Sequence, residues 1–146
     1  MYKIRNLESA DYFKGFLKLL EHLTLTGDMH KTLFENILKK VNLNPYHFVF
    51  VMLNSDETKI IGTITVLMEW KFIHGGAQVC HVEDVVICPD YQGKGLGREL
   101  LSYVKNWVKE SYPHCYKIIL DCKEENVKFY KKCDFKQNGF EMRYNY

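Results

Sequence analysis

The segment from His81 to Leu101, HVEDVVICPDYQGKGLGRELL, constrains the fold of this chain more than any other. Its first part, Val82 to Ile87, is rich in β-branched residues and predicts a strand. Pro89 ends that strand, because proline donates no backbone N–H and restricts the residue before it. Three glycines at alternate positions then permit a tight turn, and a helical apolar pattern begins at Leu96. This order of strand, turn and helix start favours the binding of phosphate oxygens by backbone N–H groups.

Three known glycine-loop patterns can be compared with this turn. The dinucleotide-binding fingerprint requires a small residue where Arg98 stands, and the Walker A loop requires a Gly-Lys-Ser/Thr sequence that this segment lacks. The third pattern, Gln/Arg-x-x-Gly-x-Gly/Ala, is met by Gln92, Gly95 and Gly97. The turn therefore resembles the acetyl-CoA pyrophosphate loop of the GNAT superfamily of N-acetyltransferases. An ordinary glycine-rich turn is the alternative, and the flanking strand and helix favour the ligand loop.

The composition predicts one soluble globular domain over residues 1–146, with 47% hydrophobic and 26% charged residues. A net charge of +2 gives no argument for broad nucleic-acid binding, and no apolar run reaches the length of a membrane span. The N-terminus lacks the apolar core of a signal peptide. Five cysteines without a CxxC pair favour free thiols over a disulfide frame or a zinc site. We therefore expect a cytoplasmic protein with no metal, no nucleic-acid partner and no membrane partner.

The apolar pattern along the chain predicts the element order β-α-α-β-β-β-α-β-α-β-β. Short turns before the central strand predict antiparallel pairing there, whereas the helix between the central strand and segment 115–122 predicts a parallel pair with a right-handed crossover. The expected fold is an α/β (α+β) mixed sheet, mostly antiparallel, with helices on both faces. The predictions include a helix from Ser9 toward Gly27 with Phe13 and Leu23 on its core face. They also include a helix over 29–40 with core positions Leu33, Phe34, Ile37 and Leu38, and a hairpin of 135–137 with 140–144 that turns at Asn138-Gly139.

This element order is also that of the GNAT acyltransferase fold, so the resemblance covers nearly the whole chain. Within the superfamily, the series LTLTG, KFIH, HVEDVV, YQGKGLGRELL, CYKIILDC and NVKFYKKCDF is similar to eukaryotic-type glucosamine-6-phosphate N-acetyltransferases. The resemblance implies a homodimer with a shared active site. It implies direct transfer of acetyl from acetyl-CoA to the 2-amino group of D-glucosamine 6-phosphate, a step toward UDP-N-acetylglucosamine. The alternatives are a GNAT enzyme for another amine, such as a polyamine or a protein N-terminus, and a non-catalytic acetyl-CoA-binding module.

The same resemblance implies catalytic roles for four residues. Tyr130 would face the departing thiolate as an acid, since a phenol donates a hydrogen bond without prior ionisation. The backbone N–H of Val85 would point at the thioester carbonyl, and a bulge in the strand would free it from the ladder. Glu83 and Asp121 would lie near the amine, with Asp121 as a candidate general base. The structural alternatives are a core tyrosine at position 130 and purely structural salt bridges made by Glu83 and Asp84. Strand alternation places the side chains of these two acidic residues on opposite faces.

The implied binding residues form two sets. The residues implied to hold acetyl-CoA are Val85, Val86, Ile87, Gly93, Lys94, Gly95, Leu96, Gly97, Arg98, Asp121, Cys122, Lys123, Asn126 and Tyr130. The residues implied to contact the sugar phosphate are Thr24, Lys71, Phe72, Ile73, His74, Glu83, Asp84, Val85, Tyr116, Lys117 and Arg143. Lys71 and Lys117 are ordinary surface lysines in the alternative reading. The family has an arginine where Asn145 stands, and Arg143 is the candidate replacement because alternation puts both on one face of the predicted last strand.

Overall fold

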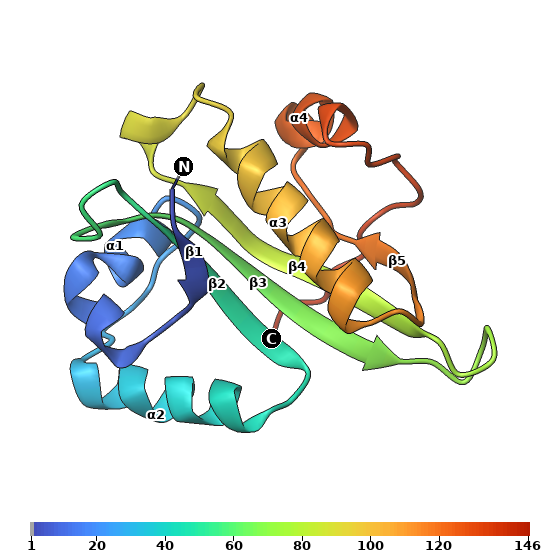
Figure 1. Cartoon of the computed structure of the whole chain (residues 1–146), viewed down its shortest axis with the longest axis horizontal. Helices are drawn as coiled ribbons and strands as arrows, with labels where there is room; N and C mark the ends of the chain where they lie inside the picture. The colour runs from blue at the N-terminus through green and yellow to red at the C-terminus, as the bar shows by residue number, and fades with distance from the viewer. Residues whose placement is uncertain (1) are drawn as a thin grey trace.

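The computed structural model describes residues 2–146 and shows one mixed sheet flanked by helices (Figure 1). The strands are β1 (Ile4–Asn6), β2 (His47–Leu53), β3 (Ile60–Trp70), β4 (Gln78–Ile87) and β5 (Cys115–Ile119). The helices are α1 (Phe16–Leu20), α2 (Lys31–Leu43), α3 (Leu96–Ser111) and α4 (Val127–Lys132), with 3-10 turns at Ser9–Lys14, Pro89–Tyr91 and Glu124–Asn126. The strands lie in the order β1-β2-β3-β4-β5, antiparallel except for the parallel pair β4–β5. The predicted fold class and pairing directions are confirmed.

The core lies at the middle of the sheet, where both faces are covered. Residues 50–53 of β2 and 60–66 of β3 are buried without alternation, as in strands packed on both sides. Helix α3 crosses one face, where Trp107 and Tyr103 pack their rings 5.1 and 5.3 Å from the ring of Phe50. Helices α1 and α2 contact β2, β3 and β4. This double cover fixes β4, the strand that leads into the glycine turn.

The first predicted helix is divided in the structure. Gly15 adopts a left-handed φ of 84° and separates the 3-10 turn from α1. The turn is oriented by Asp11, which is fully buried and accepts hydrogen bonds from the Arg5 guanidinium at 2.7 and 2.8 Å. With Asp11 facing inward, Phe13 points outward and is 73% exposed. Leu23, which follows α1, is 42% exposed, so the prediction that Phe13 and Leu23 face the core was wrong.

Helix α2 also buries a narrower face than its sequence predicted. Phe34 and Leu38 are buried, whereas Leu33 and Ile37 remain about two-fifths exposed, at 39% and 40%. Only one edge of this helix rests on β2 and on the first turn of the chain. The helix therefore presents a partly apolar outer side.

The predicted C-terminal hairpin does not form. Within residues 133–146 the structure has no strand, although Gly139 takes the positive φ of 111° that a turn requires. A two-stranded hairpin is marginal unless an apolar face packs on it, and Phe140 and Tyr144 remain 92% and 84% exposed. Strand alternation therefore does not place Arg143 and Asn145. Among the described residues, no helix is long and apolar enough to cross a membrane.

Candidate active site

A β-bulge interrupts β4 in the middle of the HVEDVV segment. Thr65 pairs with Glu83 and Thr63 pairs with Val86, so that Asp84 and Val85 together stand opposite the single residue Ile64. Asp84 adopts a left-handed φ of 49°, which is uncommon for a residue other than glycine. Such a bulge leaves one residue out of the ladder and turns its backbone groups away from the partner strand. The expected bulge is present, and it breaks the simple alternation that was expected for Glu83 and Asp84.

Strands β4 and β5 separate just before the bulge. Their pairing ends at His81 with Ile119, after which β4 runs on to Ile87 while the chain leaves β5 toward α4. The separation opens a groove of about 670 Å³ between the end of β4, the glycine turn and α4. The residues that line the groove and were expected to hold acetyl-CoA are Val85, Val86, Ile87, Gly93, Gly95, Leu96, Gly97, Arg98, Asn126 and Tyr130. This first pocket is called the coenzyme groove below.

The glycine turn presents its backbone to the coenzyme groove. Gly93 and Gly95 have φ values of 75° and 80°, and Gly95 is the N-cap of α3, where it offers no side chain to the first helical turn. The Gln92 amide holds the turn to the strand by donating to the carbonyl of Ile87 at 3.0 Å. The ammonium of Lys94 donates to the Asp90 carbonyl and lies 4.8 Å from the ring centre of Tyr91. The N–H groups at the start of α3 are thus placed to receive an anion.

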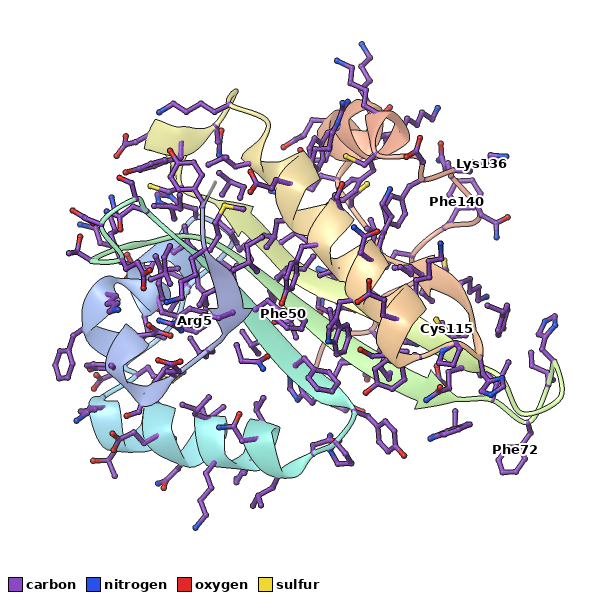
Figure 2. The ribbon with its side chains drawn as sticks, viewed as in Figure 1. Arg5, Phe50, Phe72, Cys115, Lys136 and Phe140 are labelled. Carbon is purple, nitrogen blue, oxygen red and sulfur yellow. The ribbon has the colours of Figure 1, made fainter. Side chains whose placement is uncertain are left out.

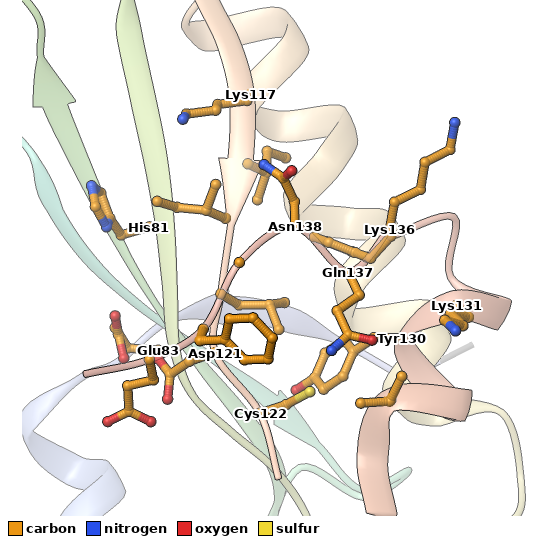
Figure 3. Close-up of a pocket in the computed structure, with 18 residues that line it drawn as sticks. His81, Glu83, Lys117, Asp121, Cys122, Tyr130, Lys131, Lys136, Gln137 and Asn138 are labelled. Carbon is orange, nitrogen blue, oxygen red and sulfur yellow. The ribbon is translucent and has the colours of Figure 1, made fainter. Parts of the chain in front are cut away.

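A second pocket, of about 450 Å³, shares Tyr130 with the coenzyme groove and is lined by residues of β4, of β5 and of the segments that follow β5 (Figure 3). Two carboxylates, Glu83 and Asp121, lie close together at one end, and Cys122 and Tyr130 lie beside them. Lys117 and His81 line the opposite end. The C-terminal segment from Phe135 to Glu141 closes one wall. We call this the acceptor pocket.

The titratable groups between the two pockets have shifted pKa values. Burial raises the pKa of Glu83, and the charges of Asp121 and Asp84 raise it further. Burial also raises the pKa of Tyr130 to about 12, with smaller contributions from Cys122, Cys133 and Asp121. A phenol with this pKa keeps its proton at neutral pH. Tyr130 lines both pockets, so this residue lies at their junction.

The expected sugar-phosphate residues are only partly brought together. His74 at the β3–β4 turn packs its ring 4.2 Å from the ring of Tyr116, and the Lys117 ammonium lies 5.4 Å from the same tyrosine ring. Lys71 donates to Glu69 at 2.6 Å. Arg143 donates to Glu141, a wall residue of the acceptor pocket, at 2.8 Å. Within the described chain, the expected binding residues that line neither pocket are Thr24, Lys71, Phe72, Ile73, His74, Asp84, Lys94, Tyr116, Lys123 and Arg143.

Several lining residues were not anticipated from the sequence. His22 and Leu23, which follow α1, line the coenzyme groove together with Phe129. His81 and Glu141 line the acceptor pocket. His81 had a sequence signal, because it precedes Glu83 by two positions and therefore shares its face of β4. Among the described residues, no three His, Cys, Asp or Glu side chains are placed together so that they could hold a metal ion.

The fold and the glycine turn define an acyltransferase of the GNAT type. The sequence model of the Acetyltransferase (GNAT) family matches residues 1–135. The chain belongs to this family.

Its curated relatives are more specific. The chain is 34% identical to glucosamine 6-phosphate N-acetyltransferase of Arabidopsis thaliana, over 97% of its own length and 94% of that protein's. It is 36% identical to the enzyme of the same name from Candida albicans, over 97% and 93% of the two chains. The crystal structure of the Arabidopsis enzyme superposes with a TM-score of 0.93 at 33% identity, and covers 100% of this chain and 99% of that chain. An acetyltransferase of Trypanosoma brucei superposes with a TM-score of 0.90 at 31% identity, over 100% of both chains.

Proposed function

We propose that this protein transfers the acetyl group of acetyl-CoA to the 2-amino group of D-glucosamine 6-phosphate, giving N-acetyl-D-glucosamine 6-phosphate. The observation that carries the proposal is the meeting of two pockets at Tyr130. One pocket is bounded by a glycine turn and a helix start, and the other contains paired carboxylates. The relatives named for this reaction support the choice of acceptor.

The coenzyme groove suits acetyl-CoA in shape and polarity. The backbone N–H groups of residues 93–98 would hold the pyrophosphate, because Gly93 and Gly95 turn the chain without side chains in the way and α3 adds its dipole. Val86 and Ile87 would pair with the pantetheine amides. Asn126 would bind nearby, and Asp121, Cys122 and Lys123 would flank the thioester end. When bound, the coenzyme supplies the acetyl group as a thioester.

The residues at the bulge and junction would carry the chemistry. The Val85 N–H, turned out of the ladder, would donate to the thioester carbonyl oxygen. Glu83, whose burial raises its pKa, would accept a proton from the ammonium group of the acceptor. Asp121 would orient the amine and is the second candidate base. Tyr130 keeps its proton, with a pKa of about 12, and would donate to the thiolate that leaves.

The acceptor pocket suits a molecule with an amine at one end and an anionic group at the other. Glu83 and Asp121 lie at one end, and Lys117 lies at the other. The remaining sugar-phosphate contacts would come from the β3–β4 turn, from Tyr116 and Thr24, and from Arg143, which is drawn to the pocket wall by Glu141.

We further propose that the protein works as a homodimer with a shared active site. The alternating apolar residues Phe140, Met142, Tyr144 and Tyr146 are nearly fully exposed in the single chain, which is the pattern of a strand that lacks its sheet. A partner chain would supply that sheet, and it would carry Arg143 into a neighbouring pocket. The mass in solution, measured by light scattering, tests this proposal against the 17.3 kDa of one chain. We place the protein in the cytoplasm, because its five thiols are free.

A thiol-release assay with acetyl-CoA and a panel of amines tests the proposed reaction. The panel contains glucosamine 6-phosphate, glucosamine, a polyamine and a peptide with a free N-terminus. We expect turnover of the sugar phosphate, and Tyr130→Phe should lower kcat by about 100-fold or more while leaving the KM for acetyl-CoA unchanged. Preference for the polyamine or peptide would select the other enzymatic alternative. Coenzyme binding without release of thiol from any amine would indicate a binding module.

A further inference from the structure

Glu69, Lys71 and His81 form a cluster of side chains beside the acceptor pocket, and two of them, Glu69 and His81, have been given no role above. Glu69 of β3 accepts a hydrogen bond from the Lys71 ammonium at 2.6 Å through one carboxylate oxygen. Its other oxygen lies 2.7 Å from Nε2 of His81 on β4. Each oxygen of Glu69 therefore holds one cationic or polar group, and the side chain joins the β3–β4 turn to the face of β4 that carries Glu83.

The stability of the fold gives little reason for this cluster. The side chains of Glu69, Lys71 and His81 are 44%, 30% and 31% exposed, and ion pairs in contact with solvent contribute about 0–1 kcal/mol. The cluster nevertheless has short hydrogen bonds. The hydrogen bond from Lys71, and then that from His81, lower the pKa of Glu69 and favour its ionised form. A solvent-accessible and oriented group of donors is the form that an anion-binding site takes.

The donors left over by Glu69 are suited to a phosphate. A lysine ammonium has three N–H donors, and Glu69 uses one of those of Lys71. Within residues 2–146 no hydrogen bond occupies Nδ1 of His81, so this ring nitrogen is left for a ligand. Lys117 lines the same end of the pocket (Figure 3). His81 and Lys117 thus line one end of the acceptor pocket, and Lys71 is held beside His81 by the same Glu69 carboxylate.

The spacing of His81 and Glu83 along β4 sets the length of ligand that could contact both side chains. Two residues along a strand span about 7 Å on the same face, which is comparable to the length of a single sugar phosphate. The carboxylates at Glu83 and Asp121 would hold the amine, and the cluster would hold the anion at the far end. The charged side chains around His81 are Glu69, which bonds to it, and Lys71, which bonds to the same carboxylate. Those that line the acceptor pocket with His81 include Glu83 from β4, Lys117 from β5 and Asp121, which follows β5.

We propose that His81 is a specificity-determining residue that binds the phosphate group of the acceptor, and that Glu69 is the positioning residue that orients His81 and Lys71 for this contact. The inference rests on the proposed function, because it states which group of the proposed acceptor binds at this end of the pocket. Glu69 also repels a phosphate, but charges this exposed are strongly screened by solvent. The orientation of two mobile side chains is therefore the larger effect.

Steady-state kinetics with glucosamine 6-phosphate and with glucosamine test the inference. For His81→Leu we expect the KM for the sugar phosphate to rise about tenfold, the cost of one charge-assisted hydrogen bond near solvent, with kcat within about twofold. For Glu69→Ala we expect a smaller rise in the same direction. The kcat/KM for glucosamine should not change in either variant. The matched control is Glu57→Gln, which breaks an exposed Lys3–Glu57 pair of 2.7 Å away from both pockets.

A second measurement separates this inference from the proposed function. Calorimetric titration with inorganic phosphate should show weaker binding to His81→Leu than to the unaltered protein, whatever amine the enzyme acetylates. The inference would be overturned by an equal loss of kcat/KM for glucosamine 6-phosphate and for glucosamine, or by unchanged affinity of His81→Leu for inorganic phosphate. A lower KM of Glu69→Ala for glucosamine 6-phosphate would also overturn it. If the unaltered protein does not acetylate glucosamine 6-phosphate at all, the proposed function fails, and the phosphate titration still decides the role of His81. Thermal melting of each variant establishes that it is folded.

Discussion

The left-handed backbone at Asp84 predicts an unusual order of stability for two simple variants. At a position in a β-strand, a glycine variant is normally less stable than an alanine variant by about 0.5–1 kcal/mol, because glycine gives the unfolded chain more conformational freedom. At a left-handed φ the order is reversed, since the Cβ of alanine costs roughly 1–2 kcal/mol there. With φ at 49°, Asp84→Gly should therefore be more stable than Asp84→Ala by about 0.5–1 kcal/mol. The two variants lack the same carboxylate, so any contact of Asp84 with a ligand cancels in the comparison.

Urea unfolding followed by circular dichroism measures this difference, and the thermal midpoints should differ by roughly 1–4 °C for a chain of this size. Val49 of β2 is the control, because it lies in the same sheet without a positive φ. There Val49→Ala should be more stable than Val49→Gly. If alanine is more stable than glycine at position 84 as well as at position 49, the bulge does not impose a left-handed residue. The argument for a fixed Val85 N–H then fails. The same pair should show a lower kcat for the alanine variant, because relaxation of the bulge displaces Val85.

Two further predictions concern the pockets. A Cβ at Gly97 would lie 2.9 Å from Cζ of Phe129, so Gly97→Ala must displace this ring in the coenzyme groove. We expect a severalfold weaker affinity for acetyl-CoA by calorimetry, and Phe129→Leu in the same chain should recover part of it; additive losses would contradict this contact. Because the pKa of Glu83 is raised, we expect activity to be lost on acidification at a pH higher than that at which an ordinary glutamate is protonated. Asp121→Asn removes one of the charges that raise this pKa, so the acid limb of kcat/KM should move to lower pH, and an unmoved limb would exclude Glu83 as the titrating base.

Local chemistry explains why part of the fold was predictable. The boundaries of β2 and the start of α3 follow from apolar patterning and from a glycine turn, which depend on neighbours in the sequence. The division of the first helix could not be read in this way. It depends on the burial of Asp11 against Arg5, a pairing that is visible only when β1 and the following turn are placed together.

The candidate site shows the same contrast. The coenzyme groove could be expected from Gln92, Gly95 and Gly97, because a backbone site leaves its mark in glycines and proline. The Glu69 cluster could not be expected, since it depends on the register that brings β3 beside β4 and on a side chain that no motif names. The C-terminal hairpin failed for the opposite reason. Its turn sequence is sound, but the surface on which it would pack is not provided within one chain.

The two pockets that meet at Tyr130 are built from different materials. In the proposed function the coenzyme would be held largely by main-chain amides of the glycine turn, whereas the acceptor would be held by side chains such as Glu83, Lys117 and His81. With this division, we expect point substitutions in the acceptor pocket to change the choice of nucleophile while binding of the acyl carrier is kept. To change the acceptor, one would therefore substitute side chains of the acceptor pocket and keep the glycine turn after β4 unchanged.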